Sequence, residues 1–315
     1  HEKILFRPSC LMKKSTRKIF AMHGARADRA VHNYIYFKWY DKYVVWFLKT
    51  GRFLRDRFGQ LSPVSRLFAM VFNRYHAKVI TDSDACKILS LQQPLDLGED
   101  AAEQVIPFPY ARKIIFSEPD YIAVMDCPCR LSREDPCLPV NVCIAVGETT
   151  AGFWLEHGEK YNVRRISQDE ALSIICAARQ RGCITTAWFK VATGGKSGVL
   201  CSCCSCCCGG LEGMRIARSI KGGEELSNMA PSGYVVGYDD ALCENCGECA
   251  DVCMFDALTT DQYGRPLYDR QKCMGCGLCV EHCPQGARSL VHAFEKGLPL
   301  DVELLQEKRA KGEWS

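Results

Sequence analysis

The feature that most constrains this chain of 315 residues is a cysteine pattern that occurs twice near its carboxyl end. In each copy, four cysteines follow one another with two, two and three residues between them, and the second copy begins thirty positions after the first. The two sets are Cys243, Cys246, Cys249 and Cys253, and Cys273, Cys276, Cys279 and Cys283. Loops this short hold three thiols around one centre while the fourth thiol begins the next element, so the repeat predicts two metal centres.

These spacings are typical of thiolates that hold [4Fe–4S] clusters. Gly247, Gly275 and Gly277 lie inside the loops, where a positive φ and a close approach of the backbone are needed. Structural zinc and disulfide bonds are the alternatives, but zinc sites commonly pair two short Cys-x-x-Cys units rather than run four cysteines together. The repeat therefore indicates iron–sulfur clusters and makes electron transfer the leading functional hypothesis.

Between the two cysteine sets, the stretches 257–260 and 266–268 flank turn residues and predict a hairpin. With this hairpin, the segment 234–291 resembles a bacterial-type dicluster ferredoxin domain, although Met254 stands where that family usually has proline. The resemblance covers less than a fifth of the chain. It implies that the first cluster takes Cys243, Cys246, Cys249 and Cys283, and that the second takes Cys273, Cys276, Cys279 and Cys253.

A second concentration of cysteines lies in the middle of the chain. Six of the eight residues at 201–208 are cysteines, and thiolates this close repel one another unless they share a cation. Together with a Cys-Pro-Cys-Arg stretch upstream, this run resembles the amino-terminal part of some ferredoxin-domain proteins of anaerobes, which implies cluster binding but no particular activity. The candidate ligands are Cys127, Cys129, Cys137, Cys143, Cys201, Cys203, Cys204, Cys206, Cys207 and Cys208.

These ten thiols are enough for two four-cysteine clusters or for one larger or unusual cluster. We therefore expect one or two additional Fe–S clusters besides the two [4Fe–4S] clusters. Zinc and reduced structural cysteines are the alternatives for this region. Cys10, Cys86, Cys176 and Cys183 are isolated in the sequence, so we expect them to be buried free thiols.

The net charge of +3 is unevenly spread along the chain. Residues 1–58 carry a local charge of +10, whereas residues 234–292 carry −5. An acidic ferredoxin-like surface commonly faces a basic redox partner. No run of eighteen apolar residues occurs, so no transmembrane helix is expected. Cysteines in ligand spacings, rather than in a disulfide framework, indicate a cytoplasmic protein of an anaerobe, with a peripheral membrane position as an alternative.

Aromatic residues recur at helical spacing between positions 36 and 54, opposite a basic side. This pattern predicts one long amphipathic helix that packs on the core or on a partner subunit, with contact to a membrane surface as the alternative. No nucleic acid is expected as a partner, because nothing in the chain resembles a recognition module. Further expected elements are helices from Ser62 to Tyr75, from Asp82 or Ser83 to Leu91 and from Ser167 to Gly182, a strand at 121–125 and a hairpin of 184–191 with 199–200.

Together these elements predict an α+β fold. Its expected parts are a mostly helical, basic and aromatic region at 1–118, a cysteine-rich α+β domain at 119–232, a dicluster ferredoxin domain at 233–292 and a helical tail at 293–315.

The leading hypothesis for function is an iron–sulfur electron-transfer subunit of a larger anaerobic oxidoreductase complex, with protein redox partners or other subunits around it. The first alternative is a reductase whose unusual cluster, at the run 201–208, binds substrate. The second alternative is a zinc- or cluster-based sensor or interaction protein.

Overall fold

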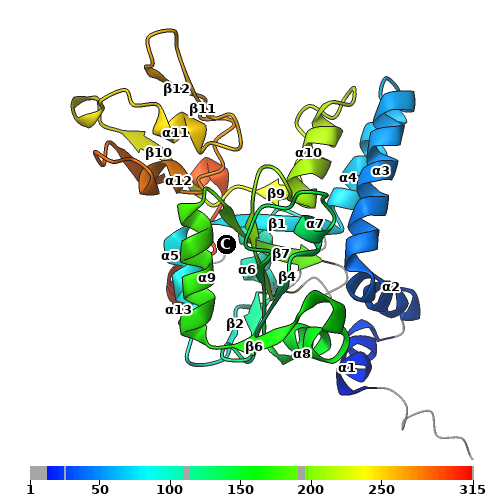
Figure 1. The fold of residues 1–315 in the computed structure, drawn as a ribbon. Helices are drawn as coiled ribbons and strands as arrows, with labels where there is room; N and C mark the ends of the chain where they lie inside the picture. The colour runs from blue at the N-terminus through cyan, green and yellow to red at the C-terminus, as the bar shows by residue number, and fades with distance from the viewer. Residues whose placement is uncertain (1–12, 25, 109–113, 191–195, 197, 314–315) are drawn as a thin grey trace, which may run out of the picture.

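A computed structural model describes residues 13–24, 26–108, 114–190, 196 and 198–313 (Figure 1). Its centre is a seven-stranded sheet in the order β6-β4-β5-β8-β7-β1-β9. Neighbouring strands are antiparallel except β1 and β9, which are parallel. The strands are β1 (Tyr75–Ile80), β4 (Ile122–Asp126), β5 (Asn141–Val146), β6 (Arg164–Ile166), β7 (Ile184–Lys190), β8 (Val199–Cys203) and β9 (Met229–Ala230). The mixture of helix and strand confirms the α+β expectation.

Both faces of this sheet are covered by helices, so its strands are apolar on both sides. Along β4, Ile122 and Val124 face one hydrophobic core, while Ala123 and Met125 face the other. The first core lies under α5 (Asp82–Leu89), α6 (Gly98–Val105), α9 (Gln168–Gln180) and α13 (Val302–Lys311). The second core lies under α2 (Ala27–Lys38), α3 (Tyr40–Phe58), α4 (Ser62–Phe72), α8 (Glu148–His157) and α10 (Gly209–Arg218). The remaining short elements of this part are α1 (Lys14–His23), α7 (Pro128–Leu131), β2 (Leu95–Asp96) and β3 (Ile115–Phe116).

The expected long amphipathic helix is wrong, because the chain turns at Trp39 (φ −125°, ψ 43°) and forms α2 and α3 instead. The break lets residues from both helices reach the second core, where Tyr36 and Tyr40 are buried. Further along α3 the aromatic side is not covered, and Trp46 and Phe53 are 62% and 60% exposed.

Two other boundaries differ from expectation. The helix that begins at Ser62 ends at Phe72, because Tyr75 already begins β1, which pairs with β7 inside the sheet. The helix α5 is capped by Thr81, whose side chain accepts a hydrogen bond from the Asp84 backbone N–H while the Asp84 carboxylate accepts one from the Thr81 backbone. The helix capped by Ser167, the strand at β4 and the β7–β8 hairpin are confirmed.

The cysteine repeat occupies a small unit that stands beside the carboxyl end of α9 (Figure 1). Its outer strands, β10 and β13, pair antiparallel, and the expected hairpin is present as β11 and β12. The helices α11 and α12 each follow a glycine with positive φ, Gly247 (83°) and Gly277 (85°), which only glycine adopts without strain. The elements are β10 (Tyr234–Tyr238), α11 (Glu248–Asp251), β11 (Leu258–Thr260), β12 (Pro266–Tyr268), α12 (Leu278–Glu281) and β13 (Arg288–His292).

Arg179, near the end of α9, joins this unit to the sheet. Its guanidinium is 2% exposed and pairs with the Glu281 carboxylate on α12, with Nε 2.8 Å from Oε2. It also donates to the Cys276 carbonyl at 2.6 Å and to the Thr185 hydroxyl at 3.2 Å. One buried side chain therefore ties α9, β7 and the second cysteine loop together.

We predict that Arg179→Ala lowers the free energy of unfolding by about 3 kcal/mol. Breaking a buried ion pair by removing one partner costs about 3–5 kcal/mol, and Glu281 can recover some solvation because its side chain is 33% exposed. Urea unfolding under anaerobic conditions measures the loss. Arg181→Ala is the control, because this arginine is exposed and donates to the Ala177 carbonyl of its own helix. Equal midpoints for the two variants would contradict the assigned role of Arg179.

Candidate metal centres

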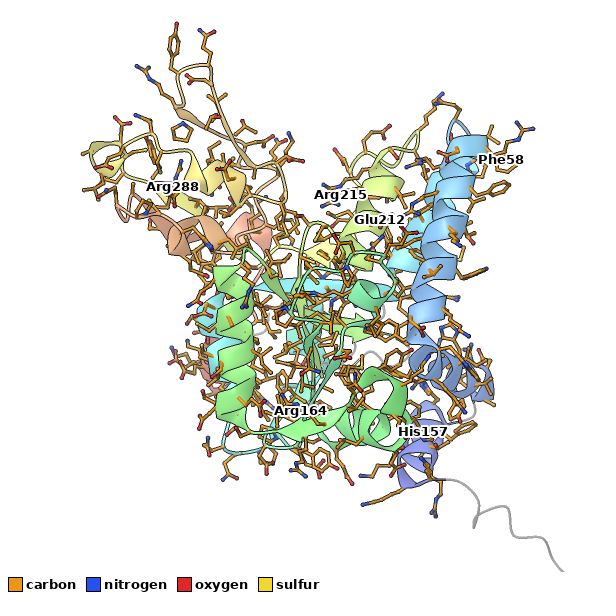
Figure 2. All side chains as sticks on the ribbon, in the orientation of Figure 1. Phe58, His157, Arg164, Glu212, Arg215 and Arg288 are labelled. Atoms are coloured by element: carbon orange, nitrogen blue, oxygen red, sulfur yellow. The ribbon has the colours of Figure 1, made fainter. Side chains whose placement is uncertain are left out.

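The four thiols expected around the first cluster line one cavity. Cys243, Cys246, Cys249 and Cys283 surround it together with Arg288, which Figure 2 places within the small unit. Backbone N–H groups and this arginine approach the sulfurs: Asn245 N lies 3.5 Å from Cys243 Sγ, Ala287 N 3.2 Å from Cys283 Sγ and Arg288 Nη2 3.6 Å from Cys249 Sγ. Donors directed at sulfur suit a negatively charged thiolate cluster, so these residues fit a [4Fe–4S] group.

The four thiols expected around the second cluster also face one another. Burial raises the pKa of Cys276 to about 12, and the neighbouring thiols of Cys253 and Cys273 add to this shift, while Arg179 opposes it. The pKa of Cys279 is raised by burial and by the same neighbours. Gly275 closes the loop at φ 64°, where an added Cβ would lie 2.1 Å from the Tyr234 carbonyl oxygen. This set therefore also fits a [4Fe–4S] group.

The two sets differ in exposure. Cys246 of the first set is exposed and lies between exposed Glu244 and Glu248. In the second set, by contrast, Cys273 and Cys279 are buried, and the Cys276 carbonyl accepts the hydrogen bond from Arg179. The first set is more open to solvent, and the second is linked through Arg179 to α9 and β7.

The cysteines of the middle region separate into two groups. We define the inner thiol group as Cys127, Cys129, Cys143, Cys201, Cys203 and Cys208, and the outer thiol group as Cys137, Cys204, Cys206 and Cys207. The run 201–208 contributes cysteines to both groups. The sequence neighbours Cys203 and Cys204 belong to different groups, as do Cys207 and Cys208. Two peptide bonds therefore connect the groups directly.

The inner thiol group lies beneath α3 and lines a cavity of about 100 Å³. Cys143 Sγ lies 3.7 Å from Cys201 Sγ, and the cavity is also walled by aromatic rings, including Tyr36, Tyr40 and Trp188. Buried Lys190 donates to the Tyr40 hydroxyl at 2.7 Å. The neighbouring thiols of Cys129 and Cys143 lower the pKa of Cys127, and the neighbouring thiol of Cys203 raises the pKa of Cys208.

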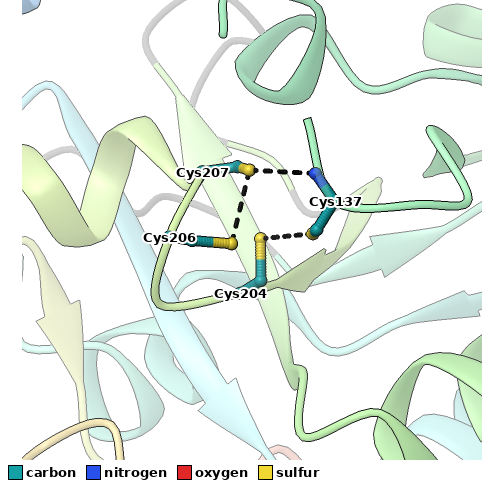
Figure 3. Close-up of side chains that lie close together, drawn as sticks. All are labelled: Cys137, Cys204, Cys206 and Cys207. Carbon is teal, nitrogen blue, oxygen red and sulfur yellow. Dashed lines mark hydrogen bonds between the residues drawn. The ribbon is translucent and has the colours of Figure 1, made fainter. Parts of the chain in front are cut away.

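The outer thiol group is much tighter (Figure 3). Its four Sγ atoms all lie within 4.8 Å of one another. Cys137 Sγ is 3.2 Å from Cys204 Sγ, and Cys206 Sγ is 3.4 Å from Cys207 Sγ. The backbone N–H of Cys137 donates to Cys207 Sγ at 3.4 Å.

Two buried groups stabilise negative charge in the outer thiol group. Hydrogen bonds from Cys183 and then Cys137, together with the positive charge of Arg130, lower the pKa of Cys204 to about 4 against the effect of burial. Arg130 is 2% exposed and donates to Cys183 Sγ at 3.4 Å and to the Cys137 carbonyl at 3.2 Å. A thiolate is therefore the favoured form of Cys204, and thiolates are the form that binds metal.

Cys183 is the site residue that the sequence prediction missed. It is buried as expected, but it is not isolated, because it contacts Cys204 and Arg130. The register pairs Ile184 with Cys203, so Cys183 lies beside Cys204. The signal in the sequence was the expected hairpin. Continuing its pairing one position beyond Ile184 and Cys203 places Cys183 opposite Cys204.

The other isolated cysteines have no comparable surroundings. Cys176 is exposed, so the expectation that it is buried is wrong; its position on α9 faces away from the core residue Ile175. Cys86 is half-buried near Asp82. Cys10 lies outside the described residues. His282 follows Glu281 and precedes Cys283, and its ring has Nδ1 2.9 Å from the Leu278 carbonyl oxygen and Nε2 3.4 Å from the Gln180 carbonyl oxygen.

Comparison with known protein families identifies residues 242–287 as a 4Fe-4S dicluster domain. This domain binds two [4Fe–4S] clusters, which confirms the class of protein module and its cofactors. The additional thiols of the middle region leave room for further sites.

Several relatives of the chain are named as subunits of redox enzymes or complexes. It is 40% identical over 65 residues to one subunit of the Na⁺-translocating ferredoxin:NAD⁺ oxidoreductase complex of Acetobacterium woodii, covering 18% of this chain and 20% of that protein. It is 40% identical over 58 residues to the formate dehydrogenase iron-sulfur subunit of Wolinella succinogenes (17% and 29%), and 33% identical over 95 residues to the thiosulfate reductase electron transfer subunit PhsB of Salmonella typhi (29% and 49%). The chain thus spans about a fifth to a half of the length of these relatives.

We predict that Cys276→Ser removes about four iron atoms and four labile sulfides per chain, because one thiolate of the second set is lost. Chemical analysis of anaerobically purified protein measures both. Cys176→Ser is the matched control, since Cys176 is exposed and outside both groups, and it should retain the full iron content. Unchanged iron in Cys276→Ser would contradict the ligand assignment.

Proposed function

We propose that this chain relays single electrons as a subunit of a larger anaerobic oxidoreductase complex. The observation that carries the proposal is the pair of four-thiol sets in one small unit, one exposed and one against the sheet. Two relatives, an iron–sulfur subunit of formate dehydrogenase and an electron transfer subunit of thiosulfate reductase, support the same role, as does the subunit of the ferredoxin:NAD⁺ oxidoreductase complex.

The residues that would hold the clusters are those named for the two sets. The first set is Cys243, Cys246, Cys249 and Cys283, and the second is Cys253, Cys273, Cys276 and Cys279. Bound there, [4Fe–4S] clusters supply reversible one-electron transfer. The chain's own donors tune that chemistry, because Arg288 and the backbone N–H groups of Asn245 and Ala287 stabilise negative charge on sulfur and thereby favour the reduced form.

The direction of the relay follows from exposure and charge. The first set faces the exterior among exposed acidic side chains, Asp240, Glu244, Glu248 and Asp251, which suit a basic partner. The second set reaches the sheet through the hydrogen bond from Arg179 to the Cys276 carbonyl. Four residues after Arg179, the chain arrives at Cys183 beside the outer thiol group.

We propose that the middle region, 119–232, which shares its sheet with β1 of the preceding region, binds a further cluster at the inner thiol group and continues this path beyond the dicluster domain at 233–292. The outer thiol group lies next to the junction, and the peptide bonds Cys203–Cys204 and Cys207–Cys208 connect it to the inner thiol group. Covalent links this short would favour electron transfer to the inner thiol group when the outer thiol group holds a redox-active metal.

A reductase is the second candidate, and the inner thiol group favours it. The six thiols of this group, joined in the cavity wall by Cys204, exceed the four that a [4Fe–4S] cluster needs, and aromatic rings complete the wall. A cluster with an unusual ligand set at this cavity would bind a small substrate. Paramagnetic resonance of the reduced protein distinguishes the candidates, since only a reductase changes its inner-site signal on adding substrate.

The amino-terminal helices offer a further contact surface. The outer face of α3 and α4 exposes Trp46, Phe53, Leu61 and Met70, and basic residues such as Lys49 lie among them. Within the described part of the chain, no helix is both long and apolar enough to cross a membrane. We propose that this face lies on an anionic membrane surface, with a partner subunit as the alternative occupant.

We predict that Glu244→Lys/Glu248→Lys slows reduction of the chain by a basic, ferredoxin-reducing redox protein about tenfold at low ionic strength, because electrostatic attraction to the acidic edge is lost. Stopped-flow absorbance measures the rate. Glu225→Lys/Glu307→Lys changes the net charge equally at positions elsewhere on the chain and should keep the rate. The difference should vanish near 1 M salt, where the screening length is about 3 Å. Equal slowing in both variants would argue against entry at the first set.

We predict that the full chain floats with vesicles of phosphatidylglycerol and phosphatidylcholine, and that Trp46→Glu/Phe53→Glu reduces the bound fraction at least fivefold because apolar contact area is lost. Tyr263→Glu is the control, since this side chain is 73% exposed but lies on the β11–β12 turn. Wild-type protein that stays unbound would exclude the membrane and favour the partner subunit.

A further inference from the structure

The sulfur spacing of the outer thiol group fits one metal ion. A tetrahedral ion with metal–sulfur distances of about 2.3 Å holds its four sulfurs about 3.8 Å apart. The outer group brackets that value, with two sulfur pairs at 3.2 and 3.4 Å and every pair within 4.8 Å (Figure 3). The space between the four sulfurs therefore fits a single ion and is too small for a [4Fe–4S] cluster.

The sulfur spacing of the outer thiol group can be compared with that of the dicluster unit in the same chain. Its eight cysteines all lie among the described residues. In the part of the chain that the structure covers, no other group of three or more histidine, cysteine or acidic side chains brings its ligand atoms this close. A [4Fe–4S] cluster interposes iron and sulfide between its thiolates, so wider spacing is expected there. The same chain thus distinguishes two kinds of thiol site.

We propose that Cys137, Cys204, Cys206 and Cys207 bind a single tetrahedral divalent ion, either zinc or ferrous iron, rather than an iron–sulfur cluster. Both ions accept four thiolates in a closed tetrahedral site. Binding displaces the remaining thiol protons to solvent. The proposal rests on sulfur geometry and is independent of the electron relay proposed for the dicluster domain.

The surroundings compensate the charge of such a site. Four thiolates and one divalent ion leave a net charge of −2. Buried Arg130 donates to Cys183 and to the Cys137 carbonyl, and Arg133 donates to the Cys207 carbonyl at 2.9 Å. Arg133 is held in turn by Glu212 at 2.6 Å, on the side of α10 that faces α3 (Figure 2). Guanidinium groups fixed in this way orient the ligands as a second layer around the ion.

The proposed ion would join two segments that are far apart in the sequence. Cys137 comes from the loop between α7 and β5, whereas the other three ligands belong to the turn after β8. An ion shared by both segments fixes this turn, and the same turn carries Cys203 and Cys208 of the inner thiol group. The mononuclear site therefore holds the inner thiols at their cavity, and ferrous iron there would also transfer an electron.

The test is metal analysis of the full chain, purified without oxygen, in wild type and Cys206→Ser. We expect Cys206→Ser to lose at least 80% of one ion per chain, with no loss of labile sulfide. Cys176→Ser, another exposed cysteine, is the matched control and should lose nothing. X-ray absorption should show four sulfurs at about 2.3 Å without a metal–metal distance. Zinc content or a high-spin ferric signal after oxidation identifies which ion is present.

Cys206→His provides the second variant, because histidine can replace one thiolate at a zinc or iron site, and it should restore the ion. Retention of the dicluster iron and its paramagnetic signal shows that each variant is folded, and it reports separately on the electron-relay proposal. Loss of about four irons and four sulfides in Cys206→Ser would overturn the mononuclear site, as would an unchanged metal content.

Discussion

Thiolates that lie close together repel one another, so each thiol group of this protein needs positive charge beside it. Each thiol group lies near a buried cationic side chain. Arg288 approaches the first dicluster set, Arg179 the second and Arg130 the outer thiol group, and all three are at most 5% exposed. Near the inner thiol group, buried Lys190 donates to Tyr40 in the cavity wall. A buried cation costs desolvation unless it is compensated, so negatively charged metal–thiolate centres and these cations stabilise each other.

The central sheet determines where the thiol groups lie relative to one another. Strand β8 delivers its cysteines at the middle of the sheet, where α3 and α10 cover one side. Adjacent cysteines at the end of the strand belong to different thiol groups, so the two groups lie only a peptide bond apart. Arg179 then connects the outer end of this assembly with the dicluster domain. The fold thus places the first dicluster set at an exposed acidic edge and the inner thiol group in an enclosed cavity with aromatic walls. The second dicluster set and the outer thiol group lie between these two ends.

Much of the dicluster domain was predictable because its information is local. The cysteine spacings, the loop glycines and the hairpin between the two halves all lie within a few residues of the chemistry they support. The N-cap at Ser167 and the β7–β8 hairpin were predictable for the same reason. Prediction was wrong for the long helix, because helical periodicity continues across Trp39 although the backbone turns there to let two helices reach one core.

The sequence alone predicted two sets of thiols suited to two clusters, since close spacing along a chain limits where three sulfurs can point. Tertiary structure decided how the remaining cysteines divide. The register of β7 and β8 brings Cys183 to Cys204, and the loop carrying Cys137 closes the outer thiol group from 67 residues away. Arg179 and Glu281 meet across 102 residues. Such contacts arise from packing, which the order of residues specifies only through the whole fold.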